Sequence, residues 1–302
     1  MPHDYDVLLP GGYFCDLIFT GLPELPRLGA DLFGSGFDMV PGACFYTVLA
    51  LHRLGLRVGW DCDFGDDFYS RFVLDAAARE GLDDRLFRWH AHPLRRVSVS
   101  FSFAHDRGFI SYKDEFVPPS SIPIIERYRP RCLLLSYLHY GVQLHALADA
   151  IHAYGGLVYM DCQARPETLD QPEVAAAIRA VDIFAPNRQE ALHLTGASSV
   201  EAALARLAEL VPLAIIKLGA EGAVARRGDE VAYAPGMPVA VVDTTGAGDC
   251  FNAGFLYGYL HDMPLEECLR RGNICGGLAT TTRGCAATPT AAQIEERLRH
   301  SP

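Results

Sequence analysis

Short apolar runs alternate with helix-like stretches along most of this sequence, and this alternation is its strongest constraint on the fold. Each run is rich in β-branched or large aliphatic residues, as expected of a strand buried on both faces. Regular alternation of strand and helix requires a parallel sheet covered by helices, so we predict a doubly wound α/β core. The predicted strands are 133–135, 157–160, 183–185 and 213–216, and the predicted helices are 142–154, 188–195, 200–210 and 247–261.

Two regions interrupt this alternation. Residues 13–38 lack a helical period, and residues 97–112 alternate apolar residues with serines on the way to a turn at 105–108. We predict strands of a small β lid in both regions, with a fixed extension of the main sheet as the alternative. No repeat or low-complexity tract marks a boundary, so residues 1–302 are expected to form one domain.

Composition excludes several classes of protein. The net charge is −11 at pH 7 and the pI is near 5.4, which argues against a partner such as nucleic acid or an anionic membrane surface. The nine cysteines are scattered without a C-x-x-C pair, the pattern of reduced thiols. The sequence shows neither a signal-peptide pattern nor an apolar run long enough to cross a membrane. We therefore expect a cytoplasmic protein with a small-molecule partner.

The most informative segment is 239–252, where an apolar run predicted as a strand leads through Gly246-Ala247-Gly248-Asp249 into an amphipathic helix. Such a turn aims unpaired backbone N–H groups and the positive helix end at one point, which suits a phosphate. Glycine lets the backbone approach an anion closely. A carboxylate would repel that phosphate but can accept a proton from an attacking hydroxyl, so we predict Asp249 to be a catalytic base. Capping of the helix is the alternative role.

Two common nucleotide-binding patterns are missing from the sequence. No G-x-x-x-x-G-K-[ST] occurs, which excludes a Walker-type loop. The 246–251 segment also lacks the dinucleotide fingerprint and the acidic residue that should follow it, which argues against an NAD-dependent oxidoreductase.

Residues 243–251 resemble the C-terminal signature of the ribokinase-like carbohydrate kinases, also called the phosphofructokinase-B type, and the resemblance extends over essentially the whole chain. It implies a doubly wound core with a β lid, and ATP-dependent transfer of the γ-phosphate to a hydroxymethyl group of a sugar or sugar derivative. It gives Asp249 the role of base, beside a turn that holds the transferred phosphate. It also implies that Asp243 and Thr245 bind a monovalent cation such as K⁺.

The resemblance implies a nucleotide end of the site as well. Residues 185–190 are similar to the family's N-x-x-E motif, in which Asn187 and Glu190 organise Mg²⁺ and its waters near the ATP phosphates. The residues alone indicate an ordinary helix start. Residues 217–222 resemble a T-L-G-x-x-G segment that lies against the nucleotide, with lysine in place of threonine. The expected nucleotide-binding residues are Asn187, Lys217, Gly219, Gly222 and Asn273, the last on the helix implied to flank adenine.

The substrate end is expected near the N-terminus. Asp16 lies in a segment similar to the one whose aspartate binds substrate hydroxyls, and a carboxylate can accept both hydrogen bonds of a vicinal diol. Residues 41–46 align with the family's di-glycine motif, but Pro41 replaces its first glycine and Tyr46 replaces its asparagine. These positions contact the sugar or form the lid hinge in the family, so Gly42 and Tyr46 are expected to bind substrate.

Several cations lie close to this end. Residues 161–165 resemble a D-x-N-x-R motif, in which Arg165 would meet a phosphate or carboxylate, with a surface ion pair as the alternative. The cations in or near the lid are Arg95, Arg96, Arg107 and Lys113. They either bind an anionic substrate or only protect the edge of the lid from aggregation.

A sugar kinase is the leading hypothesis, and two alternatives stay open. A nucleoside kinase of the same family would use aromatic residues at 13, 14, 37 and 46 to stack on a base. A non-catalytic ligand-binding or regulatory protein would account for the replacements at Pro41 and Tyr46. In the family an exposed β lid commonly pairs across a dimer, so a homodimer through the lid is included among the expected partners.

Overall fold

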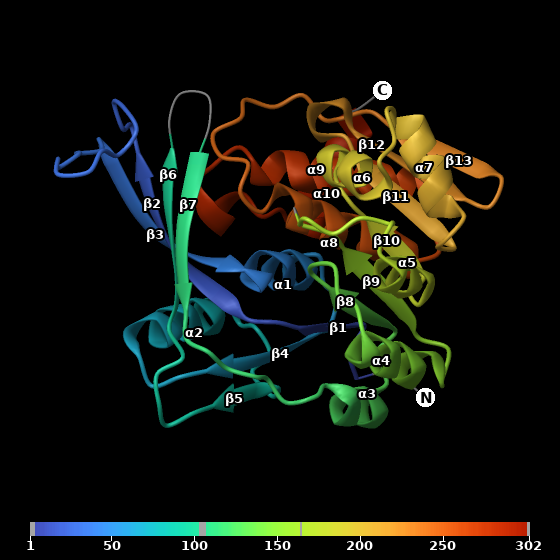
Figure 1. Ribbon diagram of the computed structural model, residues 1–302, viewed down its shortest axis with the longest axis horizontal. Coiled ribbons are helices and arrows are strands. Elements are labelled where there is room, and N and C mark those ends of the chain that lie inside the picture. The colour runs from blue at the N-terminus through green and yellow to red at the C-terminus, as the bar shows by residue number, and fades with distance from the viewer. Residues whose placement is uncertain (1–3, 103–106, 164, 301–302) are drawn as a thin grey trace.

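The computed structural model describes residues 4–102, 107–163 and 165–300, and the predicted alternation builds a nine-stranded sheet in it (Figure 1). In spatial order its strands are β13 (Glu230–Ala234), β12 (Ala223–Arg227), β11 (Leu213–Lys217), β10 (Ile183–Ala185), β9 (Leu157–Asp161), β8 (Cys132–Leu135), β1 (Val7–Pro10), β4 (Val58–Phe64) and β5 (Phe87–Trp89). Neighbouring strands from β11 to β5 are parallel, and β12 and β13 add an antiparallel edge. The predicted doubly wound, mostly parallel sheet is confirmed.

Helices cover both faces of this sheet, because successive strand residues point to opposite sides. In β8, Cys132 and Leu134 pack with one helix layer, whereas Leu133 and Leu135 pack with the other. The first layer contains α1 (Cys44–Arg53), α2 (Phe68–Glu80), α8 (Ala247–Leu260), α9 (Leu265–Ala279) and α10 (Ala291–His300). The second contains α3 (Ile122–Tyr128), α4 (Val142–His152), α5 (Pro172–Arg179), α6 (Arg188–Thr195) and α7 (Val200–Ala208).

A four-stranded sheet stands beside the core, at the left of Figure 1. Its order is β3 (Gly36–Ala43), β2 (Tyr13–Thr20), β6 (Arg96–Ser102) and β7 (Arg107–Lys113). The β2–β3 and β6–β7 pairs are antiparallel and the central β2–β6 pair is parallel. The predicted small sheet is therefore present, with β3 running beyond residue 38 directly into α1. The predicted turn at 105–108 lies partly outside the described residues.

The apolar run at 239–242 is not a strand, contrary to prediction. Val241 and Val242 are exposed, and the N–H of Val242 donates to the carbonyl oxygen of Thr280 at 2.8 Å. β-Branched residues favour strands only where a pleated neighbour can pair with them. Here the neighbouring chain is the turn after α9, so the run approaches the Gly246 turn as an irregular segment.

The lid joins the core where the site is expected. β1 continues through Gly11 and Gly12 into β2, so the base of the lid lies at the carboxyl end of β1. The carboxyl ends of β8, β9, β10 and β11 share this edge because the strands are parallel, and such edges are where open α/β sheets bind ligands.

Two other sequence expectations concern cysteines and membranes. The eight cysteines reported for the described residues are buried and form no disulfide. Within the described ranges, no helix combines the length and the apolar character needed to cross a membrane.

Candidate active site

The predicted anion-binding turn lies at the start of α8. Gly246 has φ of 75°, in the left-handed region that glycine adopts most easily. A Cβ atom on Gly246 would lie 2.6 Å from Cδ1 of Tyr46, so the ring of this buried tyrosine packs directly against the turn. No described side chain caps α8. The Ala247 N–H donates to the carbonyl oxygen of Thr244 at 3.3 Å, so the Gly246 and Gly248 N–H groups and the positive helix end are available to an anion.

Asp249 lies in the first turn of α8 and is half-buried. Its Oδ1 atom accepts a 2.7 Å hydrogen bond from the hydroxyl of Thr47 on α1. Burial raises the pKa of Asp249 to about 6, against the opposing effects of the Thr47 hydrogen bond and the Lys217 charge. A carboxylate with this pKa is ionised at neutral pH and can accept a proton. The role of Thr47 was not predicted, and its one sign in the sequence is a hydroxyl group within an apolar helix.

A buried network joins the ends of β9 and β11 to α8. Lys217 Nζ lies 2.7 Å from Asp161 Oδ1 and 3.3 Å from Asn252 Oδ1. Asn252 donates to Asp161 Oδ2 at 2.6 Å and accepts from the Tyr159 hydroxyl at 2.8 Å. A Cβ atom on Gly248 would lie 3.5 Å from Lys217 Nζ, so the ammonium group lies beside the 246–248 turn. The roles of Asp161 and Asn252 were not predicted.

Asn187 and Glu190 form a capping box at the start of α6. Asn187 Oδ1 accepts from the Glu190 N–H at 3.0 Å, and Glu190 Oε2 accepts from the Asn187 N–H at 2.8 Å. Burial raises the pKa of Glu190. Both residues also line a cavity, so the helix-start role and the predicted Mg²⁺ role are compatible. The described residues contain no cluster of three or more His, Cys, Asp or Glu side chains that could hold a metal ion.

The other predicted nucleotide residues shape the chain after β11. Gly219 begins the 3₁₀ helix η1 (Gly219–Glu221) with φ of 64°. A Cβ atom on Gly222 would lie 2.1 Å from the carbonyl oxygen of Ala234, so this close backbone contact requires glycine. Asn273 is buried on α9 and donates to the carbonyl oxygens of Ala234 at 2.9 Å and of the following proline at 3.0 Å. Its amide nitrogen thus holds the loop after β13.

Asp16 and Gly42 lie together at the base of the lid. Asp16 is 9% exposed, and a Cβ atom on Gly42 would lie 2.1 Å from its Oδ2 atom. None of the described residues donates a hydrogen bond to the Asp16 carboxylate, although burial of an unpaired carboxylate is costly. Burial raises the pKa of Asp16 to about 7, and the charge of Asp243 adds to the rise. This carboxylate is therefore suited to accept hydrogen bonds from ligand hydroxyls.

Asp243 and Thr245 lie on the irregular segment before α8. Asp243 Oδ1 accepts from the Thr245 N–H at 2.9 Å and from the Thr245 hydroxyl at 2.8 Å. These two bonds fix the conformation of the chain just before the Gly246 turn.

Arg165 follows β9 and is exposed, with its Cζ atom 5.2 Å from the centroid of the Tyr137 ring. The surface ion pair left open by the sequence is not formed, since no carboxylate of the described residues pairs with its guanidinium. Arg165 instead lines the same cavity as Asn187 and Glu190.

Comparison with known proteins agrees with this arrangement. The family model described as pfkB family carbohydrate kinase matches residues 136–292, just over half of the 302-residue chain. A fructokinase of Klebsiella pneumoniae is 28% identical over 264 residues, covering 80% of this chain and 86% of the relative. A sugar kinase of Archaeoglobus fulgidus without an assigned substrate is 46% identical over 92 residues, covering 30% of this chain and 36% of the relative.

Among solved structures, the ribokinase of Arabidopsis thaliana, described as complexed with ribose and ATP, superposes with a TM-score of 0.81 at 21% identity. The match covers 98% of this chain and 99% of that one. Fold and site together define a phosphotransferase with an alcohol group as acceptor. The chain belongs to the pfkB family of carbohydrate kinases, so the predicted family and sugar-kinase activity are confirmed.

Proposed function

We propose that this protein uses ATP to phosphorylate a hydroxymethyl group of a sugar or sugar derivative, with Asp249 as the base. The observation that carries the proposal is the position of Asp249. It lies at the N-terminal end of α8, held by Thr47 and close to the Lys217 ammonium group. The ATP complex described for the Arabidopsis ribokinase of the same fold supports the choice of donor.

In this mechanism the substrate hydroxyl lies between Asp249 and the γ-phosphate. Asp249 takes the hydroxyl proton while the oxygen attacks the γ-phosphorus, the bond to the β–γ bridging oxygen breaks, and ADP leaves with that electron pair. The N–H groups of Gly246 and Gly248 and the positive end of α8 stabilise the transferring phosphoryl group in the Gly246-Ala247-Gly248 turn. Lys217 beside Gly248 adds a positive charge close to that group.

Asn187 and Glu190 would hold Mg²⁺ and its waters. The capping box uses Oε2 of Glu190, and a carboxylate has further lone pairs for a hydrated cation in the adjoining cavity. When bound, Mg²⁺ neutralises negative charge on the ATP phosphates. Gly219 and Gly222 leave the backbone after β11 free of side chains where the nucleotide is expected to lie, and Asn273 positions the adjoining loop.

Asp16 would bind substrate hydroxyls, and Gly42 leaves room for its carboxylate. Tyr46 would support the anion-binding turn, because its ring packs against Gly246. The charge of Asp243 disfavours ionisation of Asp16, so a monovalent cation such as K⁺ near Asp243 and Thr245 would favour the ionised site. Activity measured in K⁺ and in tetramethylammonium salts at equal ionic strength tests this role.

The sugar is favoured over a nucleoside as acceptor by the placement of two aromatic residues. Tyr13 is fully buried, stacks on Phe64 at a centroid distance of 5.0 Å, and bonds to Ser70. Tyr46 is also buried, under Gly246. Neither ring can stack on a base. Two of the four aromatic residues that supported a nucleoside as substrate are therefore not available for stacking.

The lid is also the proposed dimer surface. It carries the exposed large hydrophobic side chains Phe19, Phe37, Phe109, Ile110 and Tyr112. Apolar area of this kind usually marks a contact surface. Sedimentation of wild type and Phe37→Asp would show a dimer that the substitution dissociates, and a wild-type monomer at micromolar concentration would contradict the proposal.

A coupled assay of ADP release over ketoses, aldoses, sugar acids, sugar phosphates and nucleosides tests the proposed reaction. We expect sugar-dependent ADP release that Asp249→Asn abolishes. Absence of turnover with every acceptor, despite ATP binding, would instead favour a non-catalytic regulatory protein.

A further inference from the structure

Arg96, the first residue of β6, places its guanidinium at the junction of lid and core. A Cβ atom on Gly12 would lie 2.2 Å from Nη1 of Arg96, so the guanidinium packs against the backbone after β1. Its Cζ atom is 5.2 Å from the centroid of the Tyr13 ring. The side chain is half-buried at the carboxyl edge of the sheet, on the substrate side of the proposed site.

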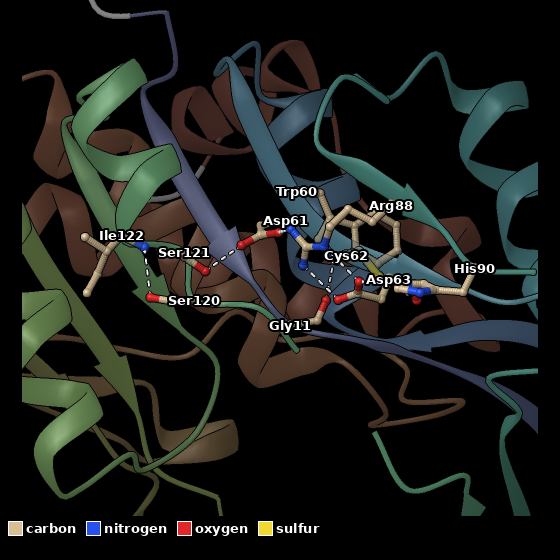
Figure 2. Close-up of polar contacts among 10 residues, drawn as sticks. All are labelled: Gly11, Trp60, Asp61, Cys62, Asp63, Arg88, His90, Ser120, Ser121 and Ile122. Carbon is tan, nitrogen blue, oxygen red and sulfur yellow. Dashed lines mark hydrogen bonds and ion pairs between the residues drawn. The ribbon is translucent and has the colours of Figure 1, made fainter. Parts of the chain in front are cut away.

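The two aspartates of β4 close to Arg96 are already engaged: Figure 2 shows Asp61 and Asp63 with Arg88, and Asp63 also with His90. Asp63 Oδ1 lies 2.8 Å from both Arg88 Nε and His90 Nε2, and Asp63 Oδ2 lies 2.7 Å from Arg88 Nη2. Arg88 also pairs with Asp61. Arg96 reaches only the carbonyl oxygen of Asp63, at 3.5 Å, and forms no ion pair with a described carboxylate.

Arg165 is a second cation that pairs with no carboxylate of the described residues. Arg165 lies over the ring of Tyr137, and the charges of both Arg165 and Arg96 oppose the rise that burial causes in the pKa of Tyr137. Arg165 thus lies over the Tyr137 ring, and the charge of Arg96 acts on the same phenol group. Burial and the charge of Arg165 lower the pKa of His139, stacked on Tyr137, to about 4, so this imidazole is neutral at physiological pH. Glu167 lines the same cavity as Arg165 and accepts a hydrogen bond from the Tyr140 hydroxyl, but it makes no ion pair with Arg165.

The topology explains why these groups meet. Gly12, Tyr137 and Arg165 follow β1, β8 and β9, which are neighbouring parallel strands with adjacent carboxyl ends. Arg96 reaches the same place from the lid. Neutral sugar hydroxyls require acceptors such as Asp16, whereas a partly buried guanidinium without a carboxylate is matched by an anion.

We infer that the substrate is a sugar that already carries an anionic group, a carboxylate or a phosphate, which Arg96 and Arg165 bind while Asp16 holds hydroxyl groups. This inference rests on the proposed function and adds the class of acceptor. The anion lies in the angle between the lid and the ends of β1 and β8, away from Lys217, whose charge is matched by Asp161.

Matched acceptors and a matched pair of arginine variants test the inference. The acceptors are D-fructose and D-ribose as neutral sugars, D-gluconate and 2-dehydro-3-deoxy-D-gluconate as carboxylates, and the 1- and 6-phosphates of D-fructose. We expect kcat/KM for one anionic class to exceed that for both neutral sugars by at least about tenfold, and the better class identifies the anion. Arg96→Gln should raise KM for that acceptor about tenfold to a hundredfold, with KM for ATP unchanged.

Arg95→Gln is the control, because Arg95 is exposed and pairs with Asp114 on the other side of the lid strand. It should leave both KM values within twofold, and Arg96→Lys, which keeps the charge without the planar fork, should give an intermediate KM. Equal or better use of neutral sugars, or an unchanged KM in Arg96→Gln, would overturn the anionic-substrate inference alone. Failure of the wild type to phosphorylate any acceptor would overturn the proposed function and this inference with it.

Discussion

Thr47 on α1 donates a 2.7 Å hydrogen bond to Oδ1 of Asp249 on α8, across 202 positions of sequence. The bond fixes one oxygen of the carboxylate and favours its ionised form against the burial that raises its pKa to about 6. Thr47 is fully buried, whereas Asp249 is half-buried, so the carboxylate is held from the core side and stays accessible on the other. α1 thus acts on the site through two residues: Thr47 lowers the proton affinity of the proposed base, and the Tyr46 ring packs against Gly246 in the proposed anion-binding turn.

Thr47→Val removes this hydrogen bond but keeps the shape of the side chain. Since the bond favours the carboxylate, its loss should raise the pKa of Asp249, and the acid limb of the kcat/KM profile should move to higher pH. In the wild type that limb should fall near pH 6, with activity lost below it. Thr195→Val, which removes another buried hydroxyl within a helix of the core, is the control. Identical acid limbs in Thr47→Val and wild type would contradict the coupling.

Asp249→Asn should lower kcat by several powers of ten while ATP binding stays near normal, because the amide keeps the shape but cannot accept the proton. Rapid-quench turnover and ATP titration measure the two effects. A variant within tenfold of wild-type turnover would exclude Asp249 as the base.

Glu190→Gln should raise the Mg²⁺ concentration needed for half-maximal activity. The amide oxygen of glutamine can still accept the hydrogen bond from the Asn187 N–H, so the capping box and the melting temperature should be retained. Glu190→Ala loses the cap as well and should also lower the melting temperature. A Mg²⁺ titration of Glu190→Gln that overlays the wild type would rule out the proposed metal role.

Asp16→Asn should raise substrate KM while stabilising the ligand-free protein. The folded-state pKa of Asp16 is raised to about 7 from an ordinary value of 3.8, so the folded protein holds this proton more tightly than the unfolded chain. The resulting stability is full below about pH 4 and is lost as pH rises toward 7. Asparagine avoids that loss.

The melting temperature of Asp16→Asn relative to wild type should therefore increase from pH 4.5 to pH 7.5, and thermal scans without ligand measure it. Substrate KM should rise about tenfold or more, because the lost hydrogen bonds to a charged acceptor are each worth roughly 1.5–3 kcal/mol. Parallel melting curves at all pH values, or an unchanged KM, would show that Asp16 is a structural residue only.

The sequence determined the elements whose signals are local. The alternation of apolar runs and helical periods predicted the parallel sheet. β10 and α6 have the predicted bounds because Pro186 and Asn187 separate the end of β10 from the start of α6, and Gly196 ends α6. The prediction of a strand at 239–242 was wrong, because a strand forms only beside the edge of another strand, and the local sequence does not show whether such an edge is present.

Tertiary structure decided which side chains meet. The sequence marks Thr47, Asp161 and Asn252 only as polar residues near apolar ones, and their contacts with Asp249 and Lys217 arise because α1 packs on α8 above the ends of β9 and β11. The motif around Arg165 left a surface ion pair and an anion site equally open. Only the fold shows that Arg165 pairs with no carboxylate of the described residues, because hydrogen bonding and ion pairing depend on distances between residues far apart in the chain, whereas secondary structure depends mainly on neighbours.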